Sequence, residues 1–599
     1  MQIELYSFYI SRELAVKFHW SLTLIKSSQQ RLILIFEEYE FFLSYIYIES
    51  NRKMSEKVEM QQSKEQATMA RGLAWLTAGN ILSRLLGVAY VIPWYIWLGE
   101  YRAEANALFS MGYQIYANFL LISTAGLPTA IAKQVAKYNV LGKEEVSLYL
   151  VREFFKLMLV FGAVFAGVMY LSAPWLADAS GSKEKLLPVM YSLVPPLFIF
   201  PAMSILRGFF QGRHDMKPYA ISQLAEQLVR VIWILAATFM IMKLGSGDYL
   251  EAVVQSTFAA FVGMIASVGI LVYTLWKQGY LGKLLHAKKQ KISLDTGQLI
   301  RETVRDAIPI IILGLTIQLL QFIDQVTFIR VMERITNYSN SELLELYSYM
   351  AANPSKITMM IIGISLSLGS VAIPLITEKF VKKDLKAASH LVADNLQLLF
   401  IFTIPAIVGT VLLAGPLYTI FYGPSEPIAI TLFIWNLFLI LPLGLYSVIS
   451  VVIQAIFENR RAIYYFLIGM LVKIVLQVPM IYVFKVYGSF ISTIFGLGIM
   501  LYLFYRRIDK VLHIDERLVI KDIATISWIS IVMGLVVWGI EFVLNLILPA
   551  NGYVSSFIHL AVAGGAGMLV FVILTLKTRQ LDRLIGSRAQ SLRRKLRLG

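Results

Sequence analysis

The sequence predicts an all-α polytopic membrane protein with fourteen transmembrane helices. Of its 599 residues, 57% are hydrophobic and only 15% are charged, whereas a soluble domain carries roughly 25% charged residues. Apolar runs near the ~20-residue length that crosses a bilayer recur from Leu73 onward. The run at 396–413 does not alternate between polar and apolar residues, as a membrane-barrel strand would.

The first 53 residues differ in composition from the fourteen expected spans that follow them. Residues 1–53 mix aromatic and charged residues without a spanning run or a signal-peptide pattern, so we expect a non-native or disordered extension, with the working protein starting near Met54. A genuine cytoplasmic extension is the alternative. The predicted spans are 73–98, 105–132, 153–176, 187–206, 219–242, 252–276, 306–329, 347–376, 391–414, 428–456, 462–484, 488–505, 523–546 and 555–576.

Basic residues predict the orientation of these spans. Lys and Arg are concentrated in alternate loops, 36 on one side against 7 on the other. Because basic loops stay in the cytoplasm, we expect a multi-pass protein of the bacterial plasma membrane with both termini cytoplasmic. The net charge of +16 then reflects topology and attraction to membrane lipids, and it does not indicate a nucleic-acid partner.

Two stretches of the first half align with the second half at nearly the same offset. Residues 207–231 can be laid on 454–478, which places Glu226 on Lys473, and 126–133 can be laid on 371–379. The shift covers six spans, so we predict two parallel six-helix lobes related by a pseudo-two-fold axis along the membrane normal. Chance alignment of apolar helices is the alternative. The expected domains are 54–276 (N-lobe), 277–305 (basic cytoplasmic linker), 306–505 (C-lobe), 506–576 (a further helix pair) and 577–599 (basic cytoplasmic tail).

Polar residues at helical spacing within these apolar spans mark the candidate site. Gln223, Glu226, Gln227 and Arg230 share one face of span 5, where Glu226 and Arg230 can pair one turn apart. Ionised groups within a span are costly and indicate function, although interhelical hydrogen bonding is the alternative interpretation. The other faces combine Asn80, Ser83, Arg84 and Gly87 in span 1, Gln318, Gln321, Asp324 and Gln325 in span 7, and Lys473 and Gln477 in span 11.

These faces predict one shared wet cavity with a cationic lining. Span 8 opens with Asn-Pro-Ser-Lys, whose Pro354 can break the helix and direct Lys356 into the lumen. Arg84 has no acidic residue within a turn, so it is the leading candidate for an anionic substrate. The candidate substrate-binding residues are Arg84, Asn80, Ser83, Glu226, Arg230, Lys356, Asp324, Gln318, Gln321 and Lys473.

Three motifs resemble a known family. The stretches 207–231, 123–138 (STAGLPTAIAKQVAKY) and 79–87 (GNILSRLLG) are similar to the SpoVB/YtgP-type polysaccharide biosynthesis exporters. These are relatives of the MurJ-like lipid II flippases in the multidrug/oligosaccharidyl-lipid/polysaccharide superfamily. The resemblance, which covers about 70–584, implies fourteen helices, two lobes, and a lipid-tail groove formed by the pair at 506–576.

The resemblance also implies roles for individual residues. Arg84 matches an essential cavity arginine of the family, while a second family arginine corresponds here to Tyr90. A third falls around Ser355 and Lys356, and an acidic residue early in span 2 is matched by Glu104. These departures mean that the family mechanism does not transfer residue for residue.

The predicted function is a flippase that moves an undecaprenyl-pyrophosphate-linked precursor, with lipid II as the preferred cargo, from the inner to the outer leaflet by alternating access. The alternatives are export of another lipid-linked polysaccharide unit and a drug/cation antiporter of the same superfamily. An enzyme is disfavoured, because none of the six His (19, 214, 286, 390, 513, 559) lies deep in a span. We expect that the protein has no cofactor or metal and that it is a monomer. Association with cell-wall synthesis or division machinery is the protein partnership that we consider.

Overall fold

The computed structural model describes residues 90–124, 126–287, 308–514, 516–582 and 587–595, with the isolated positions 82, 83, 86, 87 and 305. These residues form helices joined by short turns, and no strand occurs among them. The predicted all-α class is therefore confirmed for this part of the chain. Residues 1–53, Asn80 and Arg84 lie outside the described residues.

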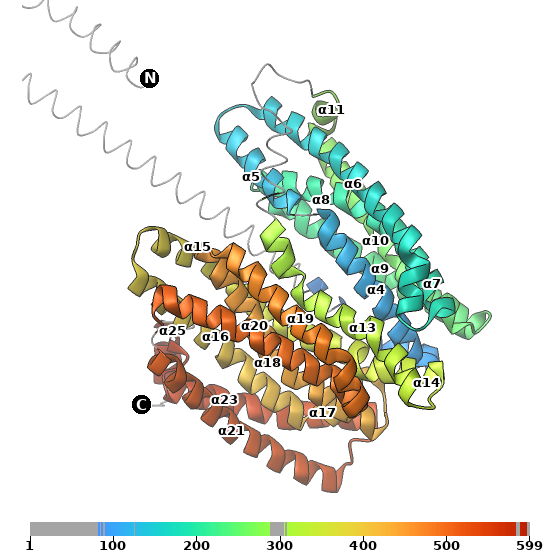
Figure 1. The fold of residues 1–599 in the computed structure, drawn as a ribbon, viewed down its shortest axis with the longest axis vertical. Helices are drawn as coiled ribbons and strands as arrows, with labels where there is room; N and C mark the ends of the chain where they lie inside the picture. Colours follow the sequence, from blue (N-terminus) through green and yellow to red (C-terminus); the bar gives the residue numbers. More distant parts are fainter. Residues whose placement is uncertain are drawn as a thin grey trace, which may run out of the picture. The chain divides into compact units, whose positions relative to one another are not determined.

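The first group of helices packs together in Figure 1, where it runs from blue to green. Helix α8 packs against both α5 and α6, while α9 packs along α10. The group comprises α3 (Val91–Leu98), α4 (Arg102–Thr124), α5 (Leu127–Val140), α6 (Glu144–Ala179), α7 (Lys183–Ser192), α8 (Val194–Gly212), α9 (Met216–Phe239), α10 (Tyr249–Lys277) and α11 (Tyr280–Leu285).

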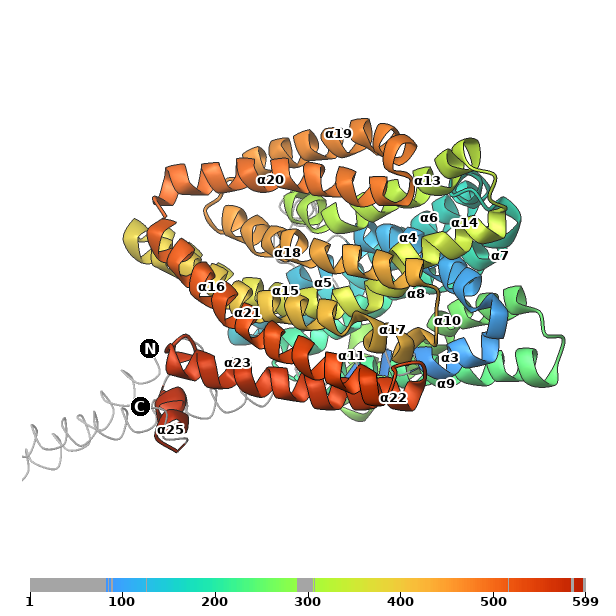
Figure 2. The same ribbon diagram turned by 90° about the horizontal axis from the view of Figure 1, so that it is seen from below.

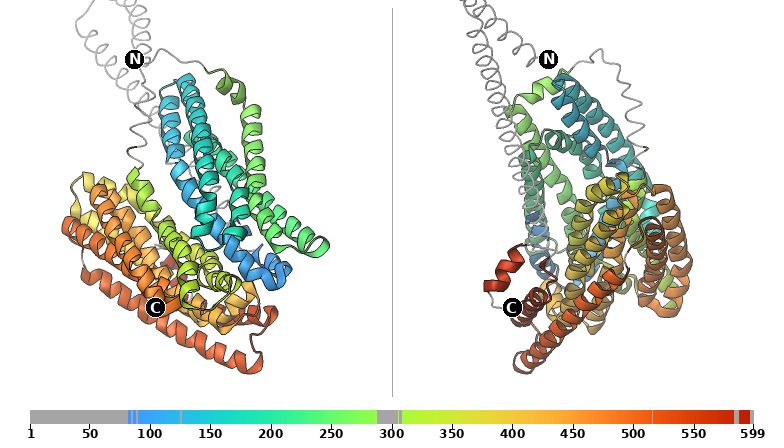
Figure 3. Two further views of the ribbon diagram at one scale, coloured as in Figure 1. Left: turned by 45° about the vertical axis from the view of Figure 1, so that its right-hand side comes forward. Right: turned by 90° about the vertical axis from the view of Figure 1, so that its left-hand side faces the viewer.

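The second group runs from yellow-green to orange, and the views of Figures 1 and 3 agree on this grouping. Helix α15 packs against α16 and α18, and α19 packs against α20. The group comprises α13 (Thr316–Ile335), α14 (Asn340–Tyr347), α15 (Asn353–Val381), α16 (Leu385–Leu412), α17 (Ala414–Tyr422), α18 (Pro427–Ala455), α19 (Asn459–Phe484) and α20 (Gly488–Leu512).

The chain then forms a helix pair that lies beside the second group. Helix α21 packs against α16 and α23, and α22 packs against α17, as Figure 2 shows. Their apolar contact is the small cluster of Leu413, Met533, Val537 and Ala563. The helices are α21 (Glu516–Ile547), α22 (Tyr553–His559) and α23 (Gly565–Lys577), followed by the short α25 (Ser587–Lys595).

Ten helical segments of the described residues are long and apolar enough to cross a membrane, or eleven if a helix pair bent by 50° at Leu315 forms one span. The protein is therefore a multi-pass membrane protein. The predicted number of fourteen is not confirmed, and the first predicted span, 73–98, lies largely outside the described residues. One segment, Asn459–Leu512, contains α19 and α20, which correspond to two predicted spans.

The helices differ from the predicted spans at several boundaries, and glycine is involved at two of them. The predicted span 105–132 is two helices, because Gly126 adopts a left-handed backbone conformation, with φ of 69°, between α4 and α5. Helix α8 was expected to end at 206 but continues to Gly212. A Cβ at Gly208 would lie only 2.6 Å from the carbonyl oxygen of Pro128 on α5. The absence of side chains at Gly208 and Gly212 therefore lets the last turns of α8 pack directly on α5.

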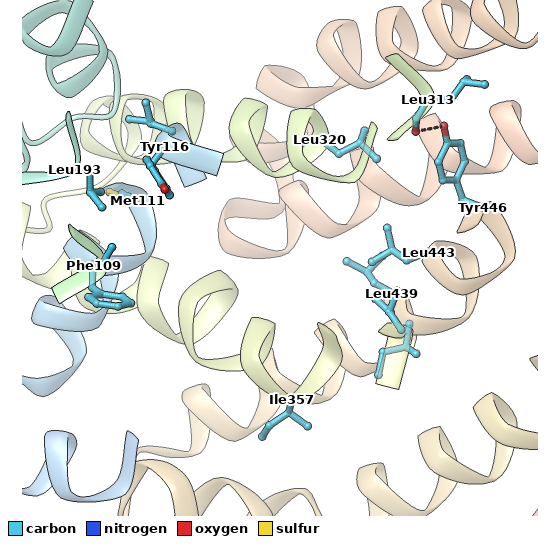
Figure 4. Close-up of a cluster of buried hydrophobic side chains, with 14 of the residues drawn as sticks. Phe109, Met111, Tyr116, Leu193, Leu313, Leu320, Ile357, Leu439, Leu443 and Tyr446 are labelled. Carbon is cyan, nitrogen blue, oxygen red and sulfur yellow. Dashed lines mark hydrogen bonds between the residues drawn. The ribbon is translucent and has the colours of Figure 1, made fainter. Parts of the chain in front are cut away.

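Most buried apolar side chains form one cluster that includes residues of both helix groups. Figure 4 shows part of it, with Phe109, Met111 and Tyr116 of α4 on one side and Leu439, Leu443 and Tyr446 of α18 on the other. Tyr446 donates a hydrogen bond of 3.0 Å to the carbonyl of Leu313. Because α4 also packs on α13 and α14, the two groups meet through α4.

Candidate functional site

A buried carboxylate on α9 is bound by two arginines. Glu226, which is 8% exposed, accepts a hydrogen bond of 2.6 Å from Arg230 one turn later on the same helix. It accepts a second bond of 2.8 Å from Arg207 on α8. The predicted Glu226–Arg230 pair is therefore confirmed. We call Arg207, Glu226 and Arg230 the glutamate cluster; with its three groups ionised, its formal charge is +1.

Arg207 was predicted to lie in a loop, and that prediction is wrong. It is buried within α8 and also donates to Ser222, at 3.2 Å, and to Ser267, at 2.9 Å. The close approach of Gly208 and Gly212 to α5 extends α8 and carries Arg207 into the interior. The spacing of these two glycines, a small-xxx-small pattern typical of membrane helix contacts, is the sequence signal that could have identified it.

Two tyrosines of α4 face the glutamate cluster. The rings of Tyr113 and Tyr116 contact each other edge to face with centroids 5.9 Å apart, and the charge of Arg230 acts on both phenols. Within the described part of the chain, both hydroxyl oxygens are buried without a hydrogen-bond partner, as is Nε of Arg230. Sequence reasoning missed both tyrosines, because aromatic residues at helical spacing in a span ordinarily indicate core packing.

A second buried ion pair joins α13 to α19. Lys473 is fully buried, and its Nζ lies 2.6 Å from Oδ1 of Asp324. Lys473 also donates to the hydroxyls of Ser492, at 3.0 Å, and Thr493, at 2.7 Å, and to the carbonyl of Ser489, at 3.2 Å. We call Asp324, Lys473 and these three α20 residues the lysine cluster. Four acceptors surround one ammonium group, which has three N–H donors.

Lys473 and Gln477 share one face, as predicted, but the polar face predicted on span 7 is divided. Gln477 donates to Asp324 at 2.9 Å. By contrast, Gln325 donates to the carbonyl of Met111 and to Ser180, both in the first helix group. Asp324 and Gln325 are consecutive, so they project about 100° apart around the helix and face different neighbours.

The other two predicted residues of span 7 lie closer to α4. The backbone carbonyl of Gln318 accepts a hydrogen bond of 2.7 Å from Gln114. The side-chain oxygen of Gln318 is buried and unpartnered among the described residues. Gln321 is half-buried.

Lys356 reaches from the second helix group into the first. Pro354 lies in the first turn of α15, as the sequence suggested. The Nζ of Lys356 donates to Asn106 of α4 at 2.9 Å and lies 5.4 Å from the ring centre of Trp94. The rings of Tyr90 and Phe109 are each 5.7 Å away. No carboxylate among the described residues lies within ion-pair distance of this ammonium, so its charge is solvated by an amide and aromatic faces.

Asn353, at the start of α15, binds side chains of both helix groups. Its Oδ1 accepts from Tyr95 of α3 and, at 2.6 Å, from Asn106 of α4. Its Nδ2 donates to Tyr418 of α17 at 2.5 Å. Asn353 is only 1% exposed, so this amide is a buried contact between the two groups.

A set of polar contacts also joins the two groups through α14. Glu104 of α4 accepts from Lys185 at 2.5 Å and from Tyr249 at 2.8 Å. The hydroxyl of Ser341 on α14 contacts both Glu104 and Lys185. Its Oγ lies 3.5 Å from Oε1 of Glu104 and accepts a hydrogen bond of 3.1 Å from Nζ of Lys185. Glu104, which the family resemblance singled out, is therefore bound at this contact.

The structure brings the predicted site residues together only in part. It forms the glutamate cluster and the lysine cluster, and no hydrogen bond or ion pair among the described residues connects them. Asn80 and Arg84 lie outside the described residues, and Ser83 is half-buried. A Cβ at Gly87 would lie 3.4 Å from Nε2 of Gln227, so Gly87 lies beside α9.

The contact between His559 and Glu541 was not predicted from the sequence. His559 of α22 is fully buried; its Nδ1 lies 2.9 Å from Oε2 of Glu541 on α21, and its Nε2 lies 2.7 Å from the carbonyl of Leu548. Asn545 also donates to Glu541, at 3.2 Å. This pair closes the turn between α21 and α22.

Comparison with known proteins identifies the family. The model of the family described as polysaccharide biosynthesis protein matches residues 69–380. The chain is 30% identical over 541 residues to the lipid II flippase MurJ of Bacillus subtilis (strain 168), which covers 88% of this chain and 98% of that protein. It is 26% identical over 178 residues to stage V sporulation protein B of the same organism, covering 30% and 34% of the two chains.

Solved structures show the same fold at low sequence identity. A lipid II flippase MurJ in an inward closed conformation superposes with a TM-score of 0.58 at 16% identity, covering 84% of this chain and 99% of that one. An inward-facing multidrug transporter of the MATE family also gives 0.58 at 16% identity, covering 72% and 95%. The chain thus has the fold of these membrane transporters, and it belongs to the polysaccharide biosynthesis protein family.

Proposed function

We propose that this protein is a flippase that moves a lipid-linked cell-wall precursor, carried on undecaprenyl pyrophosphate, from the inner to the outer leaflet. Lipid II is the preferred cargo. The proposal is supported by 30% identity to a lipid II flippase along nearly the whole of that relative. The transporter fold supports alternating access, in which two helix groups separate on one side of the membrane and then on the other.

The observation that carries the proposal is positive charge without a matching carboxylate. Glu226 balances only one of its two arginines, and Lys356 has no acidic partner among the described residues. Buried cations in a membrane protein are costly and are retained where they act. Arginine and lysine bind phosphate oxygens through charge-assisted hydrogen bonds, so these groups suit a pyrophosphate.

We assign different roles to the two clusters. Arg230 and Lys356 are proposed to contact the anionic headgroup, together with Arg84, Asn80 and Ser83, which are proposed from their sequence positions. Gln318 and Gln321 are proposed to contact the same ligand from α13. Because the partners of Lys473 already surround its ammonium, we propose that Asp324 and Lys473 position α13 against α19 and α20 and do not touch the ligand.

The two helix groups are proposed to act as the N-lobe (54–276) and the C-lobe (306–505), with both termini cytoplasmic. The contacts of Asn353 and Glu104 then hold one end of the lobes together and must break when that end opens. Residues 506–576 are proposed to guide the lipid tail. Exposed apolar side chains such as Trp538 and Leu546, which are 59% and 71% exposed, give that helix pair a lipid-facing surface.

Depletion of the protein tests the proposal. We expect an undecaprenyl-linked precursor to accumulate on the inner leaflet, and mass analysis of the lipid fraction identifies which one. Restored wild-type protein should clear it, Arg84→Lys should clear it partly, and Arg84→Ala should not, at equal membrane expression. Accumulation of a different lipid-linked unit would show that this unit, and not lipid II, is the cargo. If no lipid-linked intermediate accumulates and drug resistance changes instead, the protein is an antiporter and the flippase proposal is wrong.

A further inference from the structure

A cavity of about 540 Å³ lies at the ends of four helices of the first group. It is formed where α5 ends, α6 begins and α8 ends, and α11, which Figure 1 shows at this end of the group, contributes Tyr280. None of its lining residues belongs to the glutamate cluster or the lysine cluster. We call it the Arg213 pocket, and the lining residues on which binding depends are Asn139, Val140, Glu144, Arg213, His214 and Tyr280.

Gly212, the last residue of α8, sets the position of this pocket. A Cβ at Gly212 would lie 2.5 Å from the carbonyl oxygen of Ala132 on α5, so a side chain at this position would separate the two helices. The glycine lets the end of α8 lie against α5. It thereby places Arg213, the next residue, beside the last turn of α5.

Arg213 is the cation of the pocket, and its guanidinium is held in place with donors to spare. Its Nη1 lies 2.9 Å from Oε1 of Glu144, and its Nη2 donates to the hydroxyl of Tyr280. The guanidinium carbon lies 4.2 Å from the ring centre of Tyr280. Among the described residues these contacts use two of the five N–H donors of the guanidinium. The side chain of Arg213 is 25% exposed, so the remaining donors are open to a ligand.

The pocket also contains a hydrogen-bond acceptor without a partner. The Oδ1 atom of Asn139 is buried and has no hydrogen-bond partner in the part of the chain that the structure describes. Buried polar atoms in native proteins are ordinarily bonded, because an unpaired one destabilises the fold. The lining thus combines N–H donors with a free acceptor, so we expect a ligand that carries both an acceptor and a donor.

Apolar side chains at the rim favour a lipid over a soluble ligand. Val140, which lines the pocket, is 86% exposed, and Leu141 beside it is 57% exposed. Acyl chains can cover such side chains, whereas a soluble ligand would leave them in water. The loop segments 133–152 and 207–217 are among the basic loops that predict the cytoplasmic side. A lipid in this pocket would therefore come from the inner leaflet.

The surrounding charges select among phospholipid headgroups. Arg213 and Glu144 balance each other, while Lys143 precedes α6 and the Nζ of Lys283 lies 5.5 Å from the ring centre of Tyr280. The surroundings therefore carry excess positive charge, which favours an anionic headgroup. A choline headgroup has no donor for the free acceptor, and an ethanolamine headgroup adds another cation. A glycerol headgroup supplies a hydroxyl donor and adds no positive charge.

We infer that the Arg213 pocket binds an anionic phospholipid of the inner leaflet whose headgroup carries hydroxyl groups, as phosphatidylglycerol does. Arg213 and His214 contact the phosphate, Asn139 accepts from a headgroup hydroxyl, and Val140 contacts an acyl chain. The site uses none of the residues proposed to bind the cargo, and the inference does not depend on the flippase function. The bound lipid joins the ends of α5, α6, α8 and α11, so the lipid composition of the inner leaflet sets part of the stability of the first helix group.

The test measures binding of three probes to the purified full-length protein in detergent by calorimetry. The probes are short-chain phosphatidylglycerol, short-chain phosphatidylethanolamine and glycerophosphoglycerol, which is the free headgroup. We expect the wild-type protein to bind phosphatidylglycerol at least about fivefold more tightly than either of the others, because only this probe combines the negative charge, the hydroxyl and the acyl chains.

Two variants of the pocket separate its contacts. Asn139→Leu removes the free acceptor, so it should weaken binding of phosphatidylglycerol about fivefold without lowering the Tm. The double variant Arg213→Gln/Glu144→Gln removes both charges together and leaves neither of them unpaired. It should weaken binding of phosphatidylglycerol about tenfold or more and abolish the preference over phosphatidylethanolamine.

The matched control is Lys382→Gln/Glu378→Gln, which removes one cation and one anion from an exposed pair at the end of α15. It should leave binding of all three probes unchanged. Equal weakening by this control would mean that lipid binding follows surface charge in general. Equal affinity for the two lipids would exclude selection of an anionic headgroup, and equally tight binding of glycerophosphoglycerol would make the ligand a soluble phosphodiester. Each of these results, or unchanged phosphatidylglycerol binding in both pocket variants, overturns the inference.

Discussion

The glutamate cluster and the lysine cluster occupy aligned positions of the predicted repeat, yet they are organised in opposite ways. In the first, Glu226 is shared by two arginines, which leaves an excess positive charge. In the second, Lys473 meets Asp324 and three further oxygen acceptors, so its charge is balanced and its donors are used. Arg230 retains an unpartnered Nε within the described residues, whereas Lys473 is fully buried and bonded.

The contrast between the two clusters indicates which buried charges are available for binding. A charged group whose partners are complete contributes to stability and position, and its loss leaves the partner buried and unpaired. A charged group with remaining donors and excess charge can take a ligand. By this criterion we propose that the glutamate cluster carries binding chemistry and that the lysine cluster is a fixed internal pair. Four substitutions, with effects that decrease from the first to the last, test that division.

Lys473→Met should destabilise the protein most. It removes the cation and leaves Asp324 buried without its ion-pair partner, which typically costs about 3–5 kcal/mol. The double variant Lys473→Met/Asp324→Asn should regain most of this loss, because the uncompensated charge is gone. Thermal unfolding in detergent measures both. A single variant that is as stable as wild type would show that the lysine cluster is not the closed pair described here.

Arg230→Met should abolish transport with a smaller loss of stability, about 2 kcal/mol, because Glu226 keeps its bond to Arg207. Arg207→Met is the comparison: it removes bonds to Glu226, Ser222 and Ser267 together, so its stability loss should be larger. Precursor accumulation reports transport, and Tm reports stability. If Arg230→Met clears precursor normally, the ligand-binding role of the glutamate cluster is wrong.

Ser339→Ala should have a moderate effect outside the spans. Ser339 caps α14, the helix that contacts α4, by accepting from the backbone of Glu342, and loss of an N-cap costs about 1 kcal/mol. Hydrogen bonds from the Ser339 backbone N–H, and then from its hydroxyl, lower the pKa of Glu342. Because the pKa of the Glu342 carboxyl is lower in the folded protein than in the unfolded chain, its ionised form stabilises the folded state at a pH above the unfolded pKa. This contribution is lost as the pH falls through the folded pKa. Hydrogen exchange of the α14 amides should therefore quicken in the variant at neutral pH, and the difference should shrink in acid; a constant difference would contradict the capping role of Glu342.

Glu378→Gln should have no measurable effect on stability or transport. The Nζ of Lys382 lies 2.6 Å from Oε1 of Glu378, and this ion pair is exposed. The side chain of Glu378 is 53% exposed and that of Lys382 is 65% exposed. The hydrogen bond from Lys382 lowers the pKa of Glu378, yet an exposed pair is screened by water and salt and contributes little. The measurement is Tm with and without salt. A loss comparable to that of Arg230→Met would mean that burial is not what separates important charges from unimportant ones in this protein.

Features set by local spacing could be predicted from the sequence. The helical class follows from the length and composition of the apolar runs. The Glu226–Arg230 pair follows from a separation of four residues on a helix, and the shared face of Lys473 and Gln477 follows from the same rule. Each of these needs only the geometry of one helix.

Features that depend on a partner helix could not be predicted. Asp324 and Lys473 are 149 residues apart, and no local pattern indicates that they meet. The division between Asp324 and Gln325 arises because two different helices flank α13. Arg207 enters the interior only because α8 packs closely on α5. In each case the missing information is which neighbour covers which face.

The turn between α21 and α22 couples the two helices mechanically. Both ring nitrogens of His559 face oxygens of the preceding segment, Nδ1 the carboxylate of Glu541 and Nε2 the carbonyl of Leu548. The fully buried imidazole of α22 is thus anchored at both ends of its ring. A displacement of α22, which packs against α17, is therefore passed on to the end of α21.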